Sequence, residues 1–295
     1  MVFEKMLVCT DLSPASDALL QCVGEFKSRG LREIILAYVL HVSEVADTYV
    51  SRPDIEGTLL EEARPVLERQ KGVLEEQGFR VITKTPKGVP AQTLNRLAEE
   101  HDVSVILIGS RGRGLAKSLA LGSVSSRLLR ITTRPVLLNR IALLEGEHPE
   151  LVCRDLFRRV LFTTDFSGTA HRAFSYVGKI VESGCKMVAL LHVQDRTKTA
   201  SLRPNDAVER KKLDLERLEM LKASLMEKGA QEVAVSLRQG APADEILNAA
   251  REGDFSLIVM GSQGRGFIEE IFIGSVSYDV LRSASLPVLL IPAFR

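Results

Sequence analysis

Residues 109–125 read GSRGRGLAKSLALGSVS, and residues 261–277 read GSQGRGFIEEIFIGSVS. Both stretches follow a short apolar run, and both place Gly, two residues, Gly, nine residues and Gly-Ser at the same spacing. Glycines repeated in register indicate backbone that bends sharply or lets another group approach closely. The sequence therefore predicts two copies of one fold, each with the same glycine-rich loop.

The repeat extends over most of the chain. KMLVCTDLSPAS near the start matches RRVLFTTDFSGTA, which sets Asp11 and Asp165 154 residues apart. Further matches are KGVPAQTL with QGAPADEI, and LHV at 40–42 with LHV at 191–193. We predict two homologous domains, residues 1–141 and 156–295, with a linker over 142–155.

Apolar runs of strand length alternate with helical patterns in each half. The runs are KMLVCT, EIILAYVL, FRVITK, SVILIG and PVLLN, then RRVLFTT, KMVALLHV, EVAVSL, SLIVMG and PVLLIP. Runs this continuously apolar are typical of strands buried on both faces of a parallel sheet that helices cover. The pattern predicts an α/β fold with two tandem, doubly wound domains.

Helices are expected at 14–29, 168–183 and 206–228. In the last of these, leucines lie at helical spacing, so its charged residues are assigned to a solvated face. The leucines are Leu215, Leu218, Leu221 and Leu225. The corresponding helix of the first half contains Pro65, which is expected to kink or divide it.

Composition limits the classes of function. The chain has 295 residues, 45% of them apolar and 26% charged, with a net charge of +1. A nucleic-acid binder normally carries a basic excess, and no apolar run approaches the ~20 residues that span a bilayer. We therefore expect a cytoplasmic protein that binds neither nucleic acid nor membrane. Four cysteines without a CxxC pair, and five dispersed histidines, indicate no metal site, and we expect reduced thiols.

The repeated aspartates and glycines suggest a binding crevice. Open α/β sheets bind ligands beyond the carboxyl ends of their strands, where the strand order reverses. Asp11 and Asp165 end the first strand of each half, and Gly109 and Gly261 end the fourth. If those strands are neighbours, each aspartate shares a crevice with a glycine loop and with the N-terminus of the following helix, which favours anions.

Each of these residues also has a purely structural reading. The glycines can simply form turns, and the aspartates, each followed two residues later by serine, can cap the first helix. Serines at 123, 125, 275 and 277 can be N-caps. Two copies of a 17-residue window, each with its aspartate, favour a ligand. GxxxxGK[ST] and GxGxxG are both absent, which argues against a P-loop and a dinucleotide fingerprint.

These motifs together resemble the universal stress protein family. The resemblance rests on the Gly-2x-Gly-9x-Gly-Ser loop, the TDxS after the first strand and the closing PVLL strand, and it spans nearly the whole chain. It implies two five-stranded parallel sheets in the order 3-2-1-4-5. It also implies an ATP or AMP ligand, with Mg²⁺ or Mn²⁺ accompanying the nucleotide. The loop spacing is that of the ATP-binding branch.

The resemblance assigns a set of nucleotide-binding residues to each half. The adenosine end would be held by Asp11 and Val42, and by Asp165 and Val193. Ribose and phosphates would be held by Gly109, Gly112, Gly122, Ser123 and Ser125, and by Gly261, Gly264, Gly274, Ser275 and Ser277. Arg111 of the first loop stands where the second has Gln263, so the two sites are expected to differ.

The family implies a regulatory or sensor protein in the stress response, with no catalytic residues. A slow ATP hydrolase or phosphotransfer enzyme is the alternative, and a nucleotide-free interaction scaffold is a second one. The closing strands begin with proline, which suits sheet edges. The resemblance implies that these edges pair with each other within the chain, with a homodimer as a further option; the alternative is that the linker covers them.

Overall fold

The computed structural model describes residues 2–41, 55–110, 121–139, 141–142, 150–151, 155–199, 203–264 and 273–293. By its internal contacts the chain divides into two units, Phe3–Val152 and Cys153–Arg295. The limits 1–141 and 156–295 stay a prediction. Inside the segment taken as linker, the two-residue strands β6 (Ile141–Ala142) and β7 (Glu150–Leu151) pair antiparallel.

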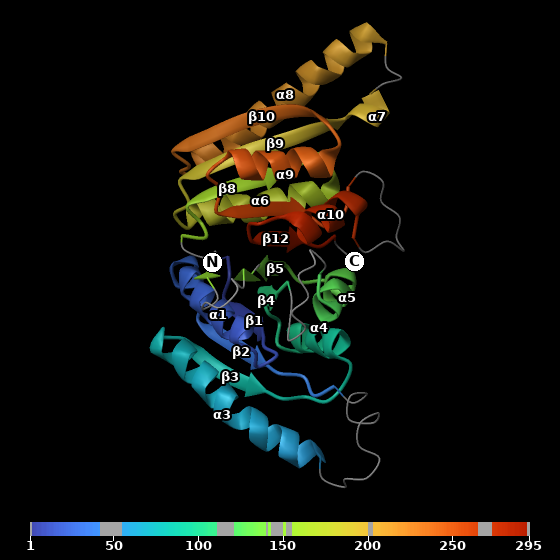
Figure 1. Cartoon of the computed structure of the whole chain (residues 1–295). Helices are drawn as coiled ribbons and strands as arrows, with labels where there is room; N and C mark the ends of the chain where they lie inside the picture. Colours follow the sequence, from blue (N-terminus) through green and yellow to red (C-terminus); the bar gives the residue numbers. More distant parts are fainter. Residues whose placement is uncertain are drawn as a thin grey trace. The chain divides into compact units, whose positions relative to one another are not determined.

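The first unit is a parallel sheet between two layers of helices (Figure 1). Its strands lie in the order β5-β4-β1-β2-β3, which is the predicted order 3-2-1-4-5. Helix α1 packs on α3, and α4 on α5. The strands are β1 (Lys5–Cys9), β2 (Glu33–Ala37), β3 (Arg80–Lys84), β4 (Val105–Gly109) and β5 (Val136–Asn139), and the helices are α1 (Pro14–Val23), the 3-10 helix η1 (Gly24–Arg29), α3 (Ile55–Glu76), α4 (Pro90–Glu100) and α5 (Ser123–Ile131).

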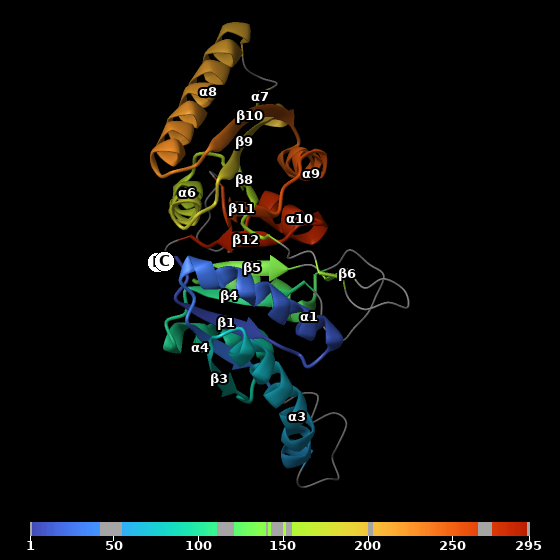
Figure 2. The ribbon, with the colours of Figure 1, turned by 90° about the vertical axis from the view of Figure 1, so that its left-hand side faces the viewer.

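The second unit repeats this arrangement, with strands in the order β10-β9-β8-β11-β12. Figure 2 shows α6 and α8 on one side of this sheet and α9 and α10 on the other. The doubly wound fold predicted for both halves is confirmed. The strands are β8 (Arg159–Thr163), β9 (Met187–Asp195), β10 (Glu232–Gly240), β11 (Leu257–Gly261) and β12 (Val288–Ile291), and the helices are α6 (Gly168–Glu182), α7 (Arg196–Thr199), α8 (Pro204–Glu227), α9 (Pro242–Glu252) and α10 (Ser275–Ser283).

The central strands are buried on both faces, as their continuous apolar runs predict. Every residue of β4 (VILIG) and of β11 (LIVMG) is buried. Because helices cover both faces, no residue on these strands can alternate toward water. Over the described ranges, no helix is long and apolar enough to cross a bilayer.

Two helix predictions need correction. The helix expected over 14–29 is α-helical only to Val23 and continues as η1, which ends at Gly30 with φ of +101°. Helix α3 runs unbroken through Pro65, so the prediction that this proline would divide the helix is wrong. A proline inside a helix removes one hydrogen bond, and packing of α3 against β3 and α1 offsets that loss.

The cysteines also differ from the expectation. Cys9 and Cys185 are free and buried, and burial raises the pKa of the Cys9 thiol far above its ordinary value. Cys22 is disulfide-bonded, so the expectation of reduced thiols is wrong for this residue. Its spacing from the other cysteines carries no recognisable pattern, which is why sequence reasoning missed it.

Candidate functional site

Each first strand ends in the same turn, TDLS at 10–13 and TDFS at 164–167. In the second unit the Thr164 hydroxyl accepts the backbone N–H of Phe166 at 2.9 Å, and Asp165 Oδ1 accepts that of Ser167 at 3.0 Å. The Ser167 hydroxyl then caps α6 by accepting the N–H of Ala170. The first unit makes the same contacts with Thr10, Asp11, Leu12, Ser13 and Ser16. Every residue of the motif except the variable third therefore has a defined bonding role.

The variable third residue of this turn is in the left-handed backbone region in both units. Leu12 has φ of +65° and Phe166 has φ of +61°. A bulky residue held there costs about 1–2 kcal/mol. Such strain persists where the surroundings over-determine it, which is common at binding sites. The repeated strain indicates that the direction of the preceding aspartate carboxylate matters in both units.

Asp165 and the glycine loop of the second unit meet at one edge of the sheet. A Cβ added to Gly264 would lie 2.6 Å from Asp165 Oδ2, far closer than real contacts allow. The Ser167 hydroxyl also donates to the backbone oxygen of Gln263, at 3.4 Å. β8 and β11 are paired neighbours, as the crevice prediction required. In the first unit Arg111 and Gly112 lie outside the described residues, but β1 and β4 pair in the same way.

The two ends of each glycine loop are joined by the backbone. Gly122 donates its N–H to the Ser110 carbonyl at 2.8 Å, and Gly274 donates to that of Ser262 at 2.7 Å. Gly261 fills a packing role, because a Cβ there would lie 2.9 Å from the Thr169 side chain on α6. These contacts close the loop into a ring whose opening faces the N-terminus of the next helix.

Ser125 and Ser277 are corrected as candidate phosphate donors. Both side chains are buried, and their hydroxyls donate to the carbonyls of Gly109 and Gly261 at 2.6 and 2.8 Å. A hydroxyl has one proton, so it cannot also donate to a phosphate. These serines instead clamp the start of α5 or α10 to the end of the fourth strand.

The N-termini of α5 and α10 are open to an anion. Their N-cap residues are Gly122 and Gly274, and neither helix has a side-chain cap. The first backbone N–H groups of a helix otherwise lack partners and attract negative charge. Ser123 and Ser275 occupy the first helical position and are exposed. Nearby, Ser262 is 2% exposed, and its hydroxyl has no hydrogen-bond partner within the described part of the chain.

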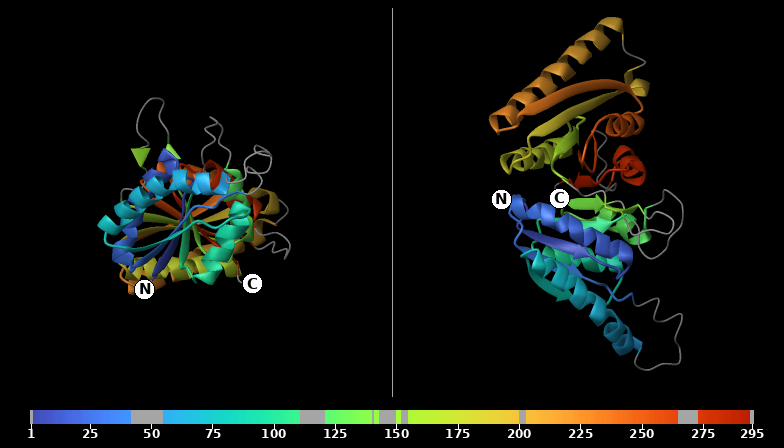
Figure 3. Two further views of the ribbon diagram at one scale, coloured as in Figure 1. Left: turned by 90° about the horizontal axis from the view of Figure 1, so that it is seen from below. Right: turned by 60° about the vertical axis from the view of Figure 1, so that its left-hand side comes forward.

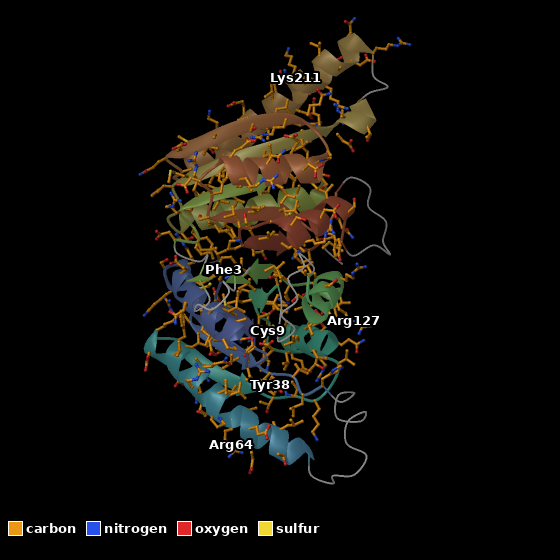
Figure 4. The ribbon with its side chains drawn as sticks, in the orientation of Figure 1. Phe3, Cys9, Tyr38, Arg64, Arg127 and Lys211 are labelled. Atoms are coloured by element: carbon orange, nitrogen blue, oxygen red, sulfur yellow. The ribbon has the colours of Figure 1, made fainter. Side chains whose placement is uncertain are left out.

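The repeated LHV tripeptides are not equivalent in the structure. Thr10 N–H bonds to the Ala37 carbonyl and Thr164 N–H to that of Leu191, so the strands match at an offset of 154 residues. Leu40 bridges Lys87 as Gln194 pairs with Gln239, which keeps that offset. The counterpart of Val193 is therefore Val39, three residues before Val42, which lies outside the described residues. Tyr38, labelled in Figure 4, stands where the second unit has His192.

A buried polar cluster beside the site belongs to the second unit alone at the matching positions. Asp214 of α8 is 2% exposed; its Oδ2 accepts from Gln194 Nε2 at 2.9 Å and lies 3.5 Å from His192 Nε2. Arg210 and Arg217 lie 4.0 and 3.6 Å from the same carboxylate. The assignment of the α8 charges to a solvated face is therefore wrong for Asp214. Its counterpart in α3, counted from the glycine that ends each helix, is buried Ala63.

His192 connects this cluster to the site. Its Nδ1 lies 2.7 Å from the Thr164 carbonyl, and its ring lies 4.7 Å from the Phe166 ring. The Arg217 guanidinium sits over that same ring at 5.4 Å. This agrees with the expectation that His192 is a hydrogen-bonded structural histidine. The cluster fixes the TDFS turn and the end of β9 to α8.

We expect Asp214→Ala to lower the free energy of unfolding of the second unit by about 2 kcal/mol, because His192 and Gln194 lose a buried charged acceptor. Urea unfolding followed by circular dichroism measures this. Asp214→Asn, which keeps an acceptor oxygen, should lose less than Asp214→Ala. Equal losses for the two variants would contradict a role for the hydrogen bonds.

Comparison with known proteins follows from this geometry. Two doubly wound sheets, each with a glycine loop at the reversal of strand order, define an α/β protein with two like crevices. A model of the universal stress protein family matches residues 3–140 and 156–292. The chain therefore belongs to the universal stress protein family, with two domains in tandem.

Similar proteins share this organisation. The crystal structure of a universal stress protein from Archaeoglobus fulgidus DSM 4304 matches with a TM-score of 0.74 and 30% identity, over 97% of each chain. A universal stress protein of Mycolicibacterium smegmatis is 27% identical over 304 residues, which is 97% of this chain and 96% of that protein. Universal stress protein MJ0577 of Methanocaldococcus jannaschii is 28% identical over 152 residues, or 46% of this chain and 94% of its own length. MJ0577 thus corresponds in length to one unit.

Proposed function

We propose that each unit binds one adenine nucleotide, ATP or AMP, and that the protein acts as a nucleotide-dependent regulator or sensor in the stress response. The observation that carries this proposal is the approach of Gly264 to the Asp165 carboxylate, next to the uncapped N-terminus of α10. That arrangement offers an acceptor for the nucleoside and backbone donors for phosphates within one crevice.

At the nucleoside end, we assign one aspartate and one backbone segment to each unit. Asp165 and Val193 serve the second unit. Asp11 and Val39 serve the first, because Val39 has the strand position of Val193. A carboxylate accepts hydrogen bonds from an exocyclic amine or from ribose hydroxyls, and a strand-end backbone can pair with the edge of a base.

At the phosphate end, we assign the glycine loop and the first turn of the following helix. The loop residues are Gly109, Gly112, Gly122 and Ser123, with Gly261, Gly264, Gly274 and Ser275 as counterparts. Gly109 and Gly261 contribute by letting the loop pack closely, and Ser125 and Ser277 contribute by clamping it. The unpaired hydroxyl of Ser262 supports a polar ligand here, because buried hydroxyls normally have a partner.

A divalent cation would come with the nucleotide. Over the described residues, no group of three His, Cys, Asp or Glu side chains could hold a metal ion by itself. Each crevice supplies one carboxylate, so we assign coordination of Mg²⁺ or Mn²⁺ chiefly to phosphate oxygens and water, which is typical of Mg²⁺.

We also propose that the protein works in the cytoplasm and that β5 and β12 pair within the chain. Each is the outermost strand on one side of its own sheet. An unpaired apolar edge readily takes up another strand. Pairing of these two edges would leave the glycine loops of both units open at the carboxyl ends of their strands.

Isothermal titration calorimetry with ATP and with AMP, each with Mg²⁺, tests the proposal. We expect saturable binding with two sites per chain and little phosphate release over the same period. No binding at millimolar nucleotide would refute the proposal and favour the scaffold alternative. Sustained hydrolysis that Asp11→Ala and Asp165→Ala together abolish would favour the enzyme alternative.

A further inference from the structure

Helix α8 carries an exposed apolar face that nothing in its own unit covers. Within the described residues, six large apolar side chains are exposed, and five of them lie on this helix. Val208 and Met220 are each 71% exposed. The other three are Leu213, Leu215 and Met226. Figure 3 shows α8 running along the outer side of the second unit, beside β10.

The duplicated helix α3 shows that the fold does not require this face to be apolar. Both helices end at a glycine with positive φ, Gly78 and Gly229, which sets their alignment at 151 residues. The buried pairs then coincide, Leu67 with Leu218 and Leu74 with Leu225. At the positions of the five exposed apolar residues, α3 carries Gly57, Glu62, Arg64, Arg69 and Glu75. Arg64, labelled in Figure 4, is the counterpart of Leu215.

The charges on the α8 face favour one partner and one orientation. Lys212 and Glu219 lie within the face, about two helical turns apart. In a parallel pair of two α8 helices in register, each would meet its own kind. In an antiparallel pair centred between Leu215 and Glu216, Lys212 faces the partner subunit's Glu219, and the two-fold axis repeats that pair. The same register brings Val208 against the partner subunit's Ala223.

We propose that the exposed face of α8 is a homodimer interface, in which α8 pairs antiparallel with α8 of a second copy of this chain. Apolar side chains at both ends of the face become buried, and two Lys212–Glu219 pairs set the register. A two-fold interface uses the same patch on both subunits, and this face is complementary to itself. The pairing is independent of nucleotide binding, and it differs from the pairing of β5 and β12 within one chain.

A charge-swap experiment on the full chain tests this interface. Sedimentation equilibrium should show concentration-dependent dimers for the unmodified protein. Lys212→Glu alone, or Glu219→Lys alone, puts like charges opposite each other at two points and should weaken self-association by about tenfold or more. Each variant also loses one weak contact within the helix, to Glu216 or to Lys222, so circular dichroism should confirm unchanged helix content.

The two single variants should associate with each other when mixed. Both interface pairs then join opposite charges, and Lys212→Glu combined with Glu219→Lys in one chain should restore the homodimer. The matched control is Glu68→Lys on α3, the counterpart of Glu219, which should leave association unchanged. The proposal is overturned if the unmodified protein stays monomeric at all concentrations, if the single variants dimerise as it does, or if mixing and recombination restore nothing.

Discussion

Replacing Gly264 by valine is expected to abolish nucleotide binding at the second unit and leave the first unit's site intact. A Cβ at this position lies 2.6 Å from Asp165 Oδ2, and the branched side chain adds further bulk. The carboxylate is the flexible end of a side chain, so it rotates away while the fold persists. Displacing it and filling the cradle should weaken binding there by about 100-fold, or roughly 3 kcal/mol.

Calorimetric stoichiometry measures this effect directly. The expected number of sites falls from two to one per chain, with the affinity of the remaining site unchanged. Gly168→Ala is the matched control: it lies three residues after Asp165, and an added Cβ there meets nothing within 4 Å. It should bind two equivalents as the unmodified protein does. Two normal equivalents for Gly264→Val would show that the nucleotide lies elsewhere.

The second large effect concerns stability, and it differs between the units. Asp11 Oδ1 accepts hydrogen bonds from Ser13 N–H, the Ser13 hydroxyl and the Ser16 hydroxyl. Ala170 stands at the position of Ser16, so the second unit cannot form the last of these. We expect Asp11→Ala to lower the free energy of unfolding by about 2 kcal/mol, and Asp165→Ala by about 1 kcal/mol.

Urea unfolding of nucleotide-free protein, with a transition fitted for each unit, measures the difference. Ser16→Ala is the control, because it makes the first turn resemble the second. In that background, Asp11→Ala should cost about as much as Asp165→Ala does, near 1 kcal/mol. An equal loss for Asp11→Ala and Asp165→Ala in the unmodified background would contradict the bonding roles assigned to the two serines.

The fold was predictable because the chain repeats itself and its strands are continuously apolar. Each half independently supports the other's strand assignment, and β4 and β11 are buried throughout as their composition indicates. The meeting of Asp165 with Gly264 also follows from sequence, once the first and fourth strands are neighbours. The order of strands came from the family resemblance, and the structure confirms it.

Register and helix rotation were not predictable from letters. LHV occurs twice, yet hydrogen bonding aligns Val39 with Val193, because insertions near the end of β2 shift the similar letters by three residues. On α8 the leucine spacing places Leu215 in the core, whereas it is 37% exposed and Asp214 is buried. An aspartate at such a position is stable only with partners from β9, which lies outside any helical pattern.

Native mass spectrometry of the freshly purified protein, followed by denaturation to identify released ligands, tests the central claim most directly. We expect two adenine nucleotides per chain after addition of Mg²⁺ and ATP, and one for Gly264→Val. A chain that stays free of nucleotide under these conditions would contradict the claim that the paired crevices are nucleotide sites, and would leave only the fold and the family.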